Sequence, residues 1–192
     1  MFPDLTPDQS AALEAHYALL IKWNKIINLT RIETLEDAVE RHYRESLFLA
    51  SHLTEGSVAD IGSGAGFPGF VVAVARPESS VTLIESHQRK AVFLKEVSRR
   101  LPNVRVLAKR ASEVRERFDW AISRAVSYAD LSTALPRLGT RVALLTGSEE
   151  PPKEWGFDWE VFPLPSARQR YLRVSRETER SVSRETNPRC FT

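Results

Sequence analysis

The segment from Val58 to Gly69 constrains the fold of this chain more than any other. It reads Val-Ala-Asp-Ile-Gly-Ser-Gly-Ala-Gly-Phe-Pro-Gly, an apolar run followed by glycines at alternate positions, Gly62, Gly64 and Gly66. Glycine lets the backbone approach a ligand closely and adopt positive φ. A strand that leads into such a turn and then into a helix predicts a cradle for a cofactor, with backbone amides of the glycines as candidate donors.

A second acidic residue follows at the offset expected of a nucleotide site. The run Val81-Thr82-Leu83-Ile84-Glu85 predicts another strand that ends in a carboxylate, about 20 residues after the glycine turn. Glu85 is therefore a candidate acceptor for ribose hydroxyls, and a carboxylate that caps the next helix is the alternative. The glycine spacing is shorter than G-x-G-x-x-G. With Asp60 ahead of it, the loop resembles the first motif of class I S-adenosylmethionine-dependent methyltransferases; a turn that binds nothing is the alternative.

Strands and helices alternate along the chain from residue 57. Strands are expected at residues 57–61, 81–85, 104–108, 120–123, 142–146, 159–163 and 171–174. Helical segments are expected at residues 68–75, 89–101, 112–117 and 130–138. This alternation predicts an α/β fold with a doubly wound, mostly parallel sheet. Because ligands bind beyond the carboxyl ends of such strands, Gly62, Glu85, Ala111-Ser112 and Arg124 should converge.

Two helices are expected ahead of the sheet, over residues 7–28 and 35–49. We therefore divide the chain into an N-terminal helical extension (1–56), a methyltransferase domain (57–176) and a tail (177–192). The polar composition of the tail predicts disorder.

Composition narrows the class of protein. A chain of 192 residues fits one domain with extensions, and it holds no apolar run long enough for a membrane span and no signal-peptide pattern. One cysteine, Cys190, excludes an internal disulfide, and the four histidines show no metal-ligand spacing. We expect a cytoplasmic, metal-free monomer.

Basic residues gather in two places. The net charge is only +2, yet residues 166–192 hold seven arginines against three glutamates. Such local basic surfaces bind nucleic acid, and a solvated arginine-rich end is the alternative. The N-terminal helices could form an RNA face with Trp23 and Tyr43, unless these aromatics are core. The candidate RNA contacts are Lys22, Lys25, Arg31, Arg44 and Arg124.

Three positions near strand ends have a binding interpretation and a simpler one. Phe67 is either a wall of the cofactor site or a core residue. Ala111-Ser112 either reads an adenine edge or caps a short helix. Arg124 either faces the crevice, where a guanidinium suits phosphate, carboxylate or a base, or forms a surface salt bridge. In the first case it should matter more for activity than for folding.

Several segments carry a family resemblance. They are Trp23-Asn24-Lys25-Ile26-Ile27-Asn28-Leu29-Thr30, His-Tyr-Arg-Glu-Ser at 42–46, the glycine loop, Leu83-Ile84-Glu85-Ser86 with Lys90 and Phe93-Leu94, and Phe118-Asp119 through Ser123-Arg124-Ala125-Val126. With them, residues 20–175 resemble the RsmG (GidB) family, guanine-N7 methyltransferases of bacterial 16S ribosomal RNA. The resemblance implies S-adenosyl-L-methionine as cofactor, 16S rRNA or the small subunit as partner, and cofactor contacts at Gly62, Phe67, Ala111, Ser112 and Arg124.

The chain departs from the family pattern at two positions. Ser112 stands where the family usually has glutamate, and Thr146 stands where strand five usually ends in lysine. The first change removes the carboxylate contact that the resemblance implies, unless Glu113 replaces it, and the second removes a positive charge on the expected RNA side.

Methylation of guanine N7 suits a site without a proton-transfer residue. N7 carries an in-plane lone pair, so no general base is required, and orientation and electrostatics supply the catalysis. No catalytic acid or base is therefore predicted. The alternatives are a methyltransferase for a small molecule or protein, and a catalytically silent RNA-binding relative.

A five-residue repeat marks the C-terminal end. Val174-Ser175-Arg176-Glu177-Thr178 recurs as Val182-Ser183-Arg184-Glu185-Thr186. One back-translation, GTT-TCA-CGT-GAA-AC, is its own reverse complement and resembles the palindrome on which bacterial chromosome-partitioning proteins load. We hypothesise that the DNA preserves the repeat; chance duplication and an arginine-rich RNA contact are the alternatives.

Overall fold

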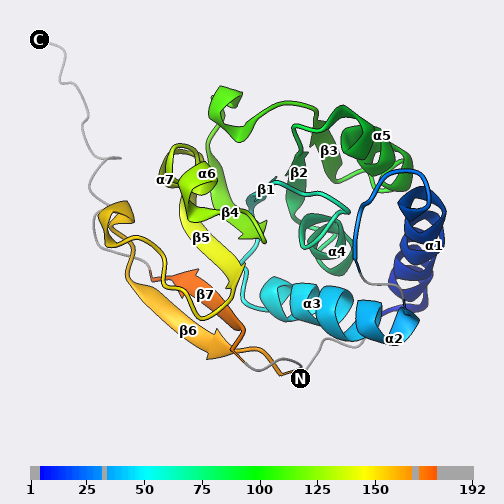
Figure 1. The fold of residues 1–192 in the computed structure, drawn as a ribbon, viewed down its shortest axis with the longest axis horizontal. Helices are drawn as coiled ribbons and strands as arrows, with labels where there is room; N and C mark the ends of the chain where they lie inside the picture. Colours follow the sequence, from blue (N-terminus) through cyan, green and yellow to red (C-terminus); the bar gives the residue numbers. More distant parts are fainter. Residues whose placement is uncertain (1–4, 32–33, 166–168, 177–192) are drawn as a thin grey trace, which may run out of the picture.

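A sheet with the strand order β3-β2-β1-β4-β5-β7-β6 forms the centre of the molecule in the computed structural model, which describes residues 5–31, 34–165 and 169–176 (Figure 1). The strands are β1 (Ser57–Ile61), β2 (Ser80–Ile84), β3 (Val104–Leu107), β4 (Phe118–Arg124), β5 (Gly139–Thr146), β6 (Trp159–Pro163) and β7 (Tyr171–Ser175). β1 to β5 pair in parallel, and β7 is antiparallel to β5 and β6. The prediction of a doubly wound, mostly parallel sheet is confirmed.

Helices cover both faces of this sheet. Those of the first half are α1 (Pro7–Asn24), α2 (Leu35–Ala38), the π-helical turn η1 (Val39–Tyr43), α3 (Arg44–Ala50), α4 (Gly69–Ala75) and α5 (Gln88–Val97). Those of the second half are the 3₁₀ turns η2 (Ala111–Glu113) and η3 (Lys153–Trp155), with α6 (Tyr128–Ser132) and α7 (Leu135–Leu138). Figure 1 shows α1, α4 and α5 on one side of the molecule and α6 and α7 on the other.

Two apolar clusters correspond to these two layers. Side chains alternate along each strand, so Val58 packs with the cluster that contains α1, α3, α4 and α5, whereas Ala59 packs with the cluster that contains α6 and α7. Nearly continuous burial along β1 and β2 is what a parallel sheet covered on both faces requires. The carboxyl ends of the strands are left for the loops.

Several predicted helices are shorter in the structure. The helix expected over 7–28 ends at Asn24, whose side-chain Oδ1 accepts hydrogen bonds from the amides of Leu29 (2.7 Å) and Thr30 (2.9 Å) and so turns the chain. The helix expected over 130–138 is divided into α6 and α7. Pro136 lies in the first turn of α7, where its missing N–H is tolerated, and it would break a continuous helix. The segments expected at 89–101 and 112–117 shorten to α5 and η2.

β1 and β4 are clamped together where both strands begin. Asp119 Oδ2 accepts hydrogen bonds from the amide and the hydroxyl of Ser57, both at 2.7 Å, and the Asp119 amide donates to Ser57 Oγ at 3.0 Å. This reciprocal pair fixes the register Val58↔Trp120. The pair lies at the amino ends of these two central strands, whereas the glycine loop follows the carboxyl end of β1.

The predicted tail, 177–192, and the second copy of the repeat lie outside the described residues. The division of the chain at residues 56 and 57 stays a prediction. Within the described ranges, no helix combines the length and hydrophobicity of a membrane span.

Candidate active site

The glycine loop adopts the left-handed backbone that its sequence predicts. Gly62, Gly64 and Gly66 have φ values of 73°, 56° and 90°. Their amides donate to Ile84 O (2.9 Å), to Glu85 Oε2 (2.9 Å) and to Ser63 O (2.7 Å). All three amides have partners within the chain, so the glycines supply space and conformation at this site, and their donation to a cofactor stays a prediction.

Two acidic side chains, Asp60 and Glu85, accept hydrogen bonds from backbone amides of the loop. Asp60 is fully buried, accepts the Gly69 amide on Oδ2 at 3.0 Å, and leaves Oδ1 without a hydrogen-bond partner. Burial raises the pKa of Asp60 to about 7. Glu85 accepts the Gly64 amide on one oxygen and the His87 amide (2.7 Å) on the other. It therefore braces the loop and the start of α5, and each oxygen keeps a lone pair for a ligand.

A cavity of about 530 Å³ opens beside the loop, beyond the carboxyl ends of β1, β2 and β3. It brings together Gly62, Gly64, Glu85, Ala111 and Ser112, as the topology predicts. The carbonyls of Ala111 and Ser112 accept hydrogen bonds from Arg137, at 3.3 and 3.4 Å, which fixes η2 at the rim. Lys90, Lys109 and Arg110 make the lining positive.

A smaller cavity of about 220 Å³ shares Gly62, Gly64, Lys90 and Val126 with the first. Phe67 forms one of its walls, stacked on the His42 ring at 4.5 Å between centroids and 6% exposed. Phe67 is thus both core and cavity wall. Thr30 Oγ1 lies 2.9 Å from His42 Nε2, and His42 Nδ1 is buried without a hydrogen-bond partner. Burial, then Arg124, lowers the pKa of His42 to about 3, so the ring is neutral at physiological pH.

Arg124 lines this smaller cavity but belongs to a buried ion cluster. Its side chain is 9% exposed and lies 3.3 Å from Glu45 Oε2, which also lies 2.9 Å from Arg170. Neither of the sequence interpretations of Arg124 included a buried partner. Burial lowers the pKa of Arg124 to about 10, so the guanidinium keeps its charge at neutral pH. A third cavity, about 550 Å³ at the ends of β4 and β5, is lined by Arg124, Arg170 and Thr146.

The candidate RNA contacts fall into two groups. Lys22, Lys25 and Arg31 are exposed, as an RNA face requires, whereas Arg44 is half-buried and pairs with Glu40 at 2.6 Å. Of the two aromatic residues, Tyr43 belongs to the core, as the alternative interpretation had it, whereas Trp23 is only partly buried. Tyr43 is 6% exposed, and Trp23 packs edge-on to Phe93 and donates to Glu96 at 3.1 Å. Of the five candidates, Arg124 is the one that lines these cavities.

Sequence reasoning missed three contributors to the site. Thr30 and His42 occur in the quoted family segments, yet nothing in their spacing assigned them to a cavity. His16, from α1, contacts the glycine loop and carries no local signal, because a single histidine on the apolar face of a helix has the pattern of an ordinary core residue.

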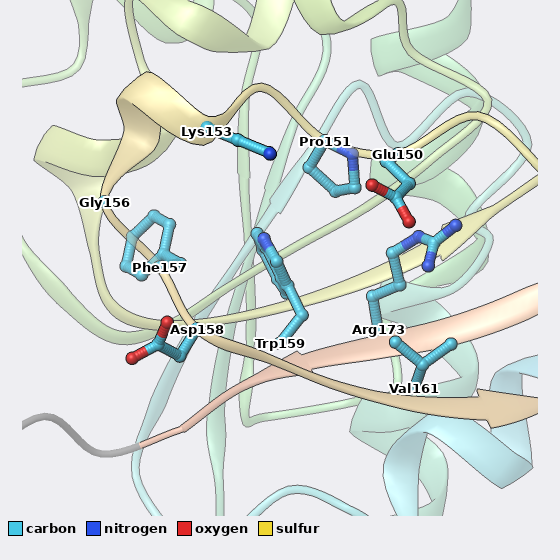
Figure 2. A pocket seen from close by; sticks show the side chains of 9 residues that line it. All are labelled: Glu150, Pro151, Lys153, Gly156, Phe157, Asp158, Trp159, Val161 and Arg173. Atoms are coloured by element: carbon cyan, nitrogen blue, oxygen red, sulfur yellow. The ribbon is translucent and has the colours of Figure 1, made fainter.

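One cavity of about 510 Å³ lies away from all predicted site residues, between the 150–159 loop and strands β6 and β7. Figure 2 shows Lys153, Phe157, Trp159 and Arg173 around it. Among the described residues, no group of His, Cys, Asp and Glu has an arrangement that would hold a metal ion.

Comparison with known sequences identifies the family. The sequence model of GidB, described as rRNA small subunit methyltransferase G, matches residues 9–155, more than half of the chain. The chain belongs to the GidB family. The resemblance inferred from the glycine loop and the Asn-Leu-Thr segment is thereby confirmed.

Curated members of the GidB family are similar over most of the described chain. "Ribosomal RNA small subunit methyltransferase G" of Methylobacillus flagellatus is 41% identical over 138 residues, 70% of this chain and 67% of the relative. The protein of the same name from Halorhodospira halophila is 41% identical over 130 residues, 67% of this chain and 61% of the relative. The chain thus spans about three fifths to two thirds of the length of these relatives.

A solved structure supports the fold of this GidB member. A SAM-dependent methyltransferase from Aquifex aeolicus superposes with a TM-score of 0.59 at 16% identity and covers 77% of this chain and 96% of that one. At this identity the likeness concerns the fold, and it confirms the predicted class I methyltransferase architecture.

Proposed function

We propose that this GidB-family chain transfers a methyl group from S-adenosyl-L-methionine to N7 of a guanosine in 16S ribosomal RNA. The observation that carries the proposal is the match of the family model to residues 9–155, which includes the whole glycine loop and both acidic strand ends. The cavities at the carboxyl ends of the strands provide a matching site.

The larger cavity suits the adenosine part of the cofactor. Glu85 has an unused lone pair on each oxygen for the ribose hydroxyls, and Ala111 and Ser112 line the part where an adenine edge would lie. The smaller cavity suits the methionine part, since it shares Gly62 with the first and continues between Phe67 and Arg124. The Arg124 guanidinium would face a carboxylate there, and the unpartnered Oδ1 of Asp60 would attract an ammonium group through water or a small shift of the loop.

The chemistry required of the protein is then modest. Bound S-adenosylmethionine supplies an electrophilic methyl group on a sulfonium sulfur. N7 of guanine attacks with its own lone pair, so no side chain must remove a proton. The chain would then contribute mainly the orientation of the methyl group toward N7.

Three basic side chains extend the proposed substrate surface beyond the cavities. Lys22, Lys25 and Arg31 are exposed on and after α1, where they are available to phosphates. The replacement of the usual glutamate by Ser112 and of the usual lysine by Thr146 removes one charge of each sign. Because the three exposed basic side chains can contact phosphates of a folded RNA, we expect 16S rRNA within a small-subunit particle to be a better substrate than free nucleosides.

The decisive experiment is methyl transfer with labelled S-adenosylmethionine to small subunits from a strain that lacks this gene. Mass spectrometry of the digested rRNA should reveal one 7-methylguanosine per 16S molecule. Labelling of small molecules or proteins instead would favour a different substrate class. Cofactor binding without transfer to any ribosomal substrate would favour a silent RNA-binding relative.

A further inference from the structure

His16 joins the N-terminal helix to the middle of the glycine loop. It lies on α1 and is fully buried. Its Nε2 is 2.9 Å from the carbonyl oxygen of Ala65, and its Nδ1 is 2.6 Å from the hydroxyl of Tyr43. Ala65 lies between Gly64 and Gly66, so this hydrogen bond reaches the loop that lines both cavities.

The partners of His16 determine how its protons are arranged. A carbonyl oxygen can only accept, so Nε2 carries the proton and donates to Ala65. Nδ1 then accepts from the Tyr43 hydroxyl. Burial lowers the pKa of His16 to about 4, which keeps the ring neutral and this tautomer intact at physiological pH.

The ring of His16 also fixes the shape of the loop by packing. It stacks on Phe70 of α4 at 4.5 Å and meets Phe67 edge-on at 5.1 Å between centroids. A Cβ on Gly66 would lie 3.1 Å from His16 Nε2, so the loop backbone passes directly against the ring. Phe67 is therefore held between His16, Tyr43 and His42 before it reaches the smaller cavity.

The beginning of the loop is hydrogen-bonded to the sheet, and the amides of Gly66 and Phe67 donate within the loop to Ser63 O. The amides of Gly62 and Ser63 donate to Ile84 O, and the Gly64 amide donates to Glu85. These contacts hold the beginning of the loop to β2. His16 holds its second half, from Ala65 to Phe67, from the side of the N-terminal helices.

We propose that His16 is a positioning residue for cofactor binding. Through it, α1 and Tyr43 of η1 hold Ala65 and Phe67 in the conformation that admits the cofactor. The proposal rests on the proposed function, since the ligand is S-adenosylmethionine. It gives the N-terminal helices a role in the cofactor site, in addition to their part in the RNA surface.

Two substitutions of His16 separate the hydrogen bond from packing. His16→Gln keeps an N–H donor near the position of Nε2, whereas His16→Met keeps a long side chain without a donor. Calorimetry with S-adenosylmethionine should give affinity for His16→Gln close to wild type. His16→Met, which leaves the buried Ala65 carbonyl unpaired, should lose about tenfold.

Leu20→Ala is the matched control for loss of stability. Leu20 lies one turn further along α1 and is 1% exposed, and its apolar side chain cannot hydrogen-bond to the loop. This variant should lower the thermal midpoint by at least as much as His16→Met and yet bind the cofactor like wild type. In steady-state assays, His16→Met should raise KM for S-adenosylmethionine and leave KM for the ribosomal substrate unchanged.

The outcomes are distinct. Equal affinity of wild type and His16→Met would overturn the positioning role, and so would an equal loss in Leu20→Ala. If His16→Met does not fold, Tyr43→Phe decides, because it keeps the ring and removes the hydroxyl that donates to His16 Nδ1 and so holds the imidazole against Ala65; unchanged affinity would then overturn the proposal. Absence of cofactor binding in wild type would instead refute the proposed function.

Discussion

Gly62 lies against Val126 so closely that a Cβ on residue 62 would come within 2.5 Å of Val126 Cγ2. The two residues follow β1 and β4, which are neighbours in the sheet. Both line the larger and the smaller cavity. The first glycine of the loop is therefore required by a side chain from another strand end as well as by its φ of 73°.

Gly62→Ala should abolish measurable cofactor binding. The new methyl group would displace Val126, which lines both cavities. Gly156→Ala is the matched control, since Gly156 has a φ of 72° and a Cβ placed there would meet nothing within 4 Å. It should lose only about 1 kcal/mol of stability, the strain of a left-handed alanine, and bind normally. Equal affinity of the two variants in calorimetry would contradict this account of the loop.

Arg124→Ala should reduce both stability and activity. The sequence alone predicted a nearly unchanged thermal midpoint, but the pair with fully buried Glu45 changes that expectation. Loss of one partner from a buried ion pair costs about 3 kcal/mol or more. Arg170→Ala, at a side chain that is 29% exposed, should cost less. Methyl transfer by folded Arg124→Ala should fall at least about tenfold, roughly 1.4 kcal/mol; full activity would remove Arg124 from the site.

A double-mutant cycle would measure the coupling free energy between Arg124 and Glu45 directly. In the Glu45→Gln background, Arg124→Ala should cost at least about 1 kcal/mol less than in wild type, because the side chain left behind is no longer charged. Additive effects in urea unfolding would argue against the coupling.

Asp60 should make stability fall as pH rises from about 4 to 7. Its pKa is raised from 3.8 to about 7 in the folded chain. Between these values the unfolded chain has released the proton and the folded chain retains it, so this group disfavours folding increasingly with pH. Asp60→Asn should match wild type near pH 4 and exceed it by a few kcal/mol at pH 8. A constant difference across this range would exclude the raised pKa.

The triple change Lys22→Ala, Lys25→Ala, Arg31→Ala should weaken binding to small subunits without affecting cofactor affinity. If each side chain contacts one phosphate, the slope of log K against log salt should become shallower by about 2 to 3. Lys153→Ala, at an exposed lysine beside the cavity of Figure 2, is the control and should leave the slope unchanged. An unaltered slope in the triple variant would place the RNA surface elsewhere.

A chain that ends at Arg176 should keep its activity. The last strand closes at Ser175, whose hydroxyl accepts the Val142 amide at 2.8 Å, and the Arg176 amide donates to Asp158 O at 2.8 Å. If the DNA preserves the five-residue repeat, the codons of both copies should spell the palindrome. Scattered synonymous codons, or lost affinity for ribosomal RNA after truncation, would assign the repeat to the protein instead.

The sequence predicted the order of strands and helices because each βα unit has its own local pattern. β1 and β6 have the predicted bounds, and the glycine loop and Glu85 meet as expected. Helix ends were less predictable, since they depend on particular side chains. Asn24 stops α1 by accepting hydrogen bonds from amides five and six residues ahead, a contact that no apolar periodicity reveals.

The missed parts of the site depend on residues distant in sequence. Glu45 and Arg124 become neighbours only after α3 has packed near the end of β4, and His16 meets Ala65 only when α1 crosses the loop. No short motif encodes either pair. Conversely, Tyr43 had the composition of an RNA face, but burial against His16 prevailed because large aromatic rings stabilise a core most when desolvated, whereas Trp23 is only partly buried against Phe93.

The hydrogen bonds between Ser57 and Asp119 lie at the opposite end of the strands from the cavity of the proposed cofactor site. Strand alignment is secured where β1 and β4 begin, whereas the cavity of the proposed cofactor site opens where strands end. Mutations in the loops around this cavity should therefore leave the register of β1 and β4 unchanged. Ser112 and Thr146, the two departures from the family pattern, both line cavities on the rim where the strands end, away from the Ser57–Asp119 pair that aligns the strands.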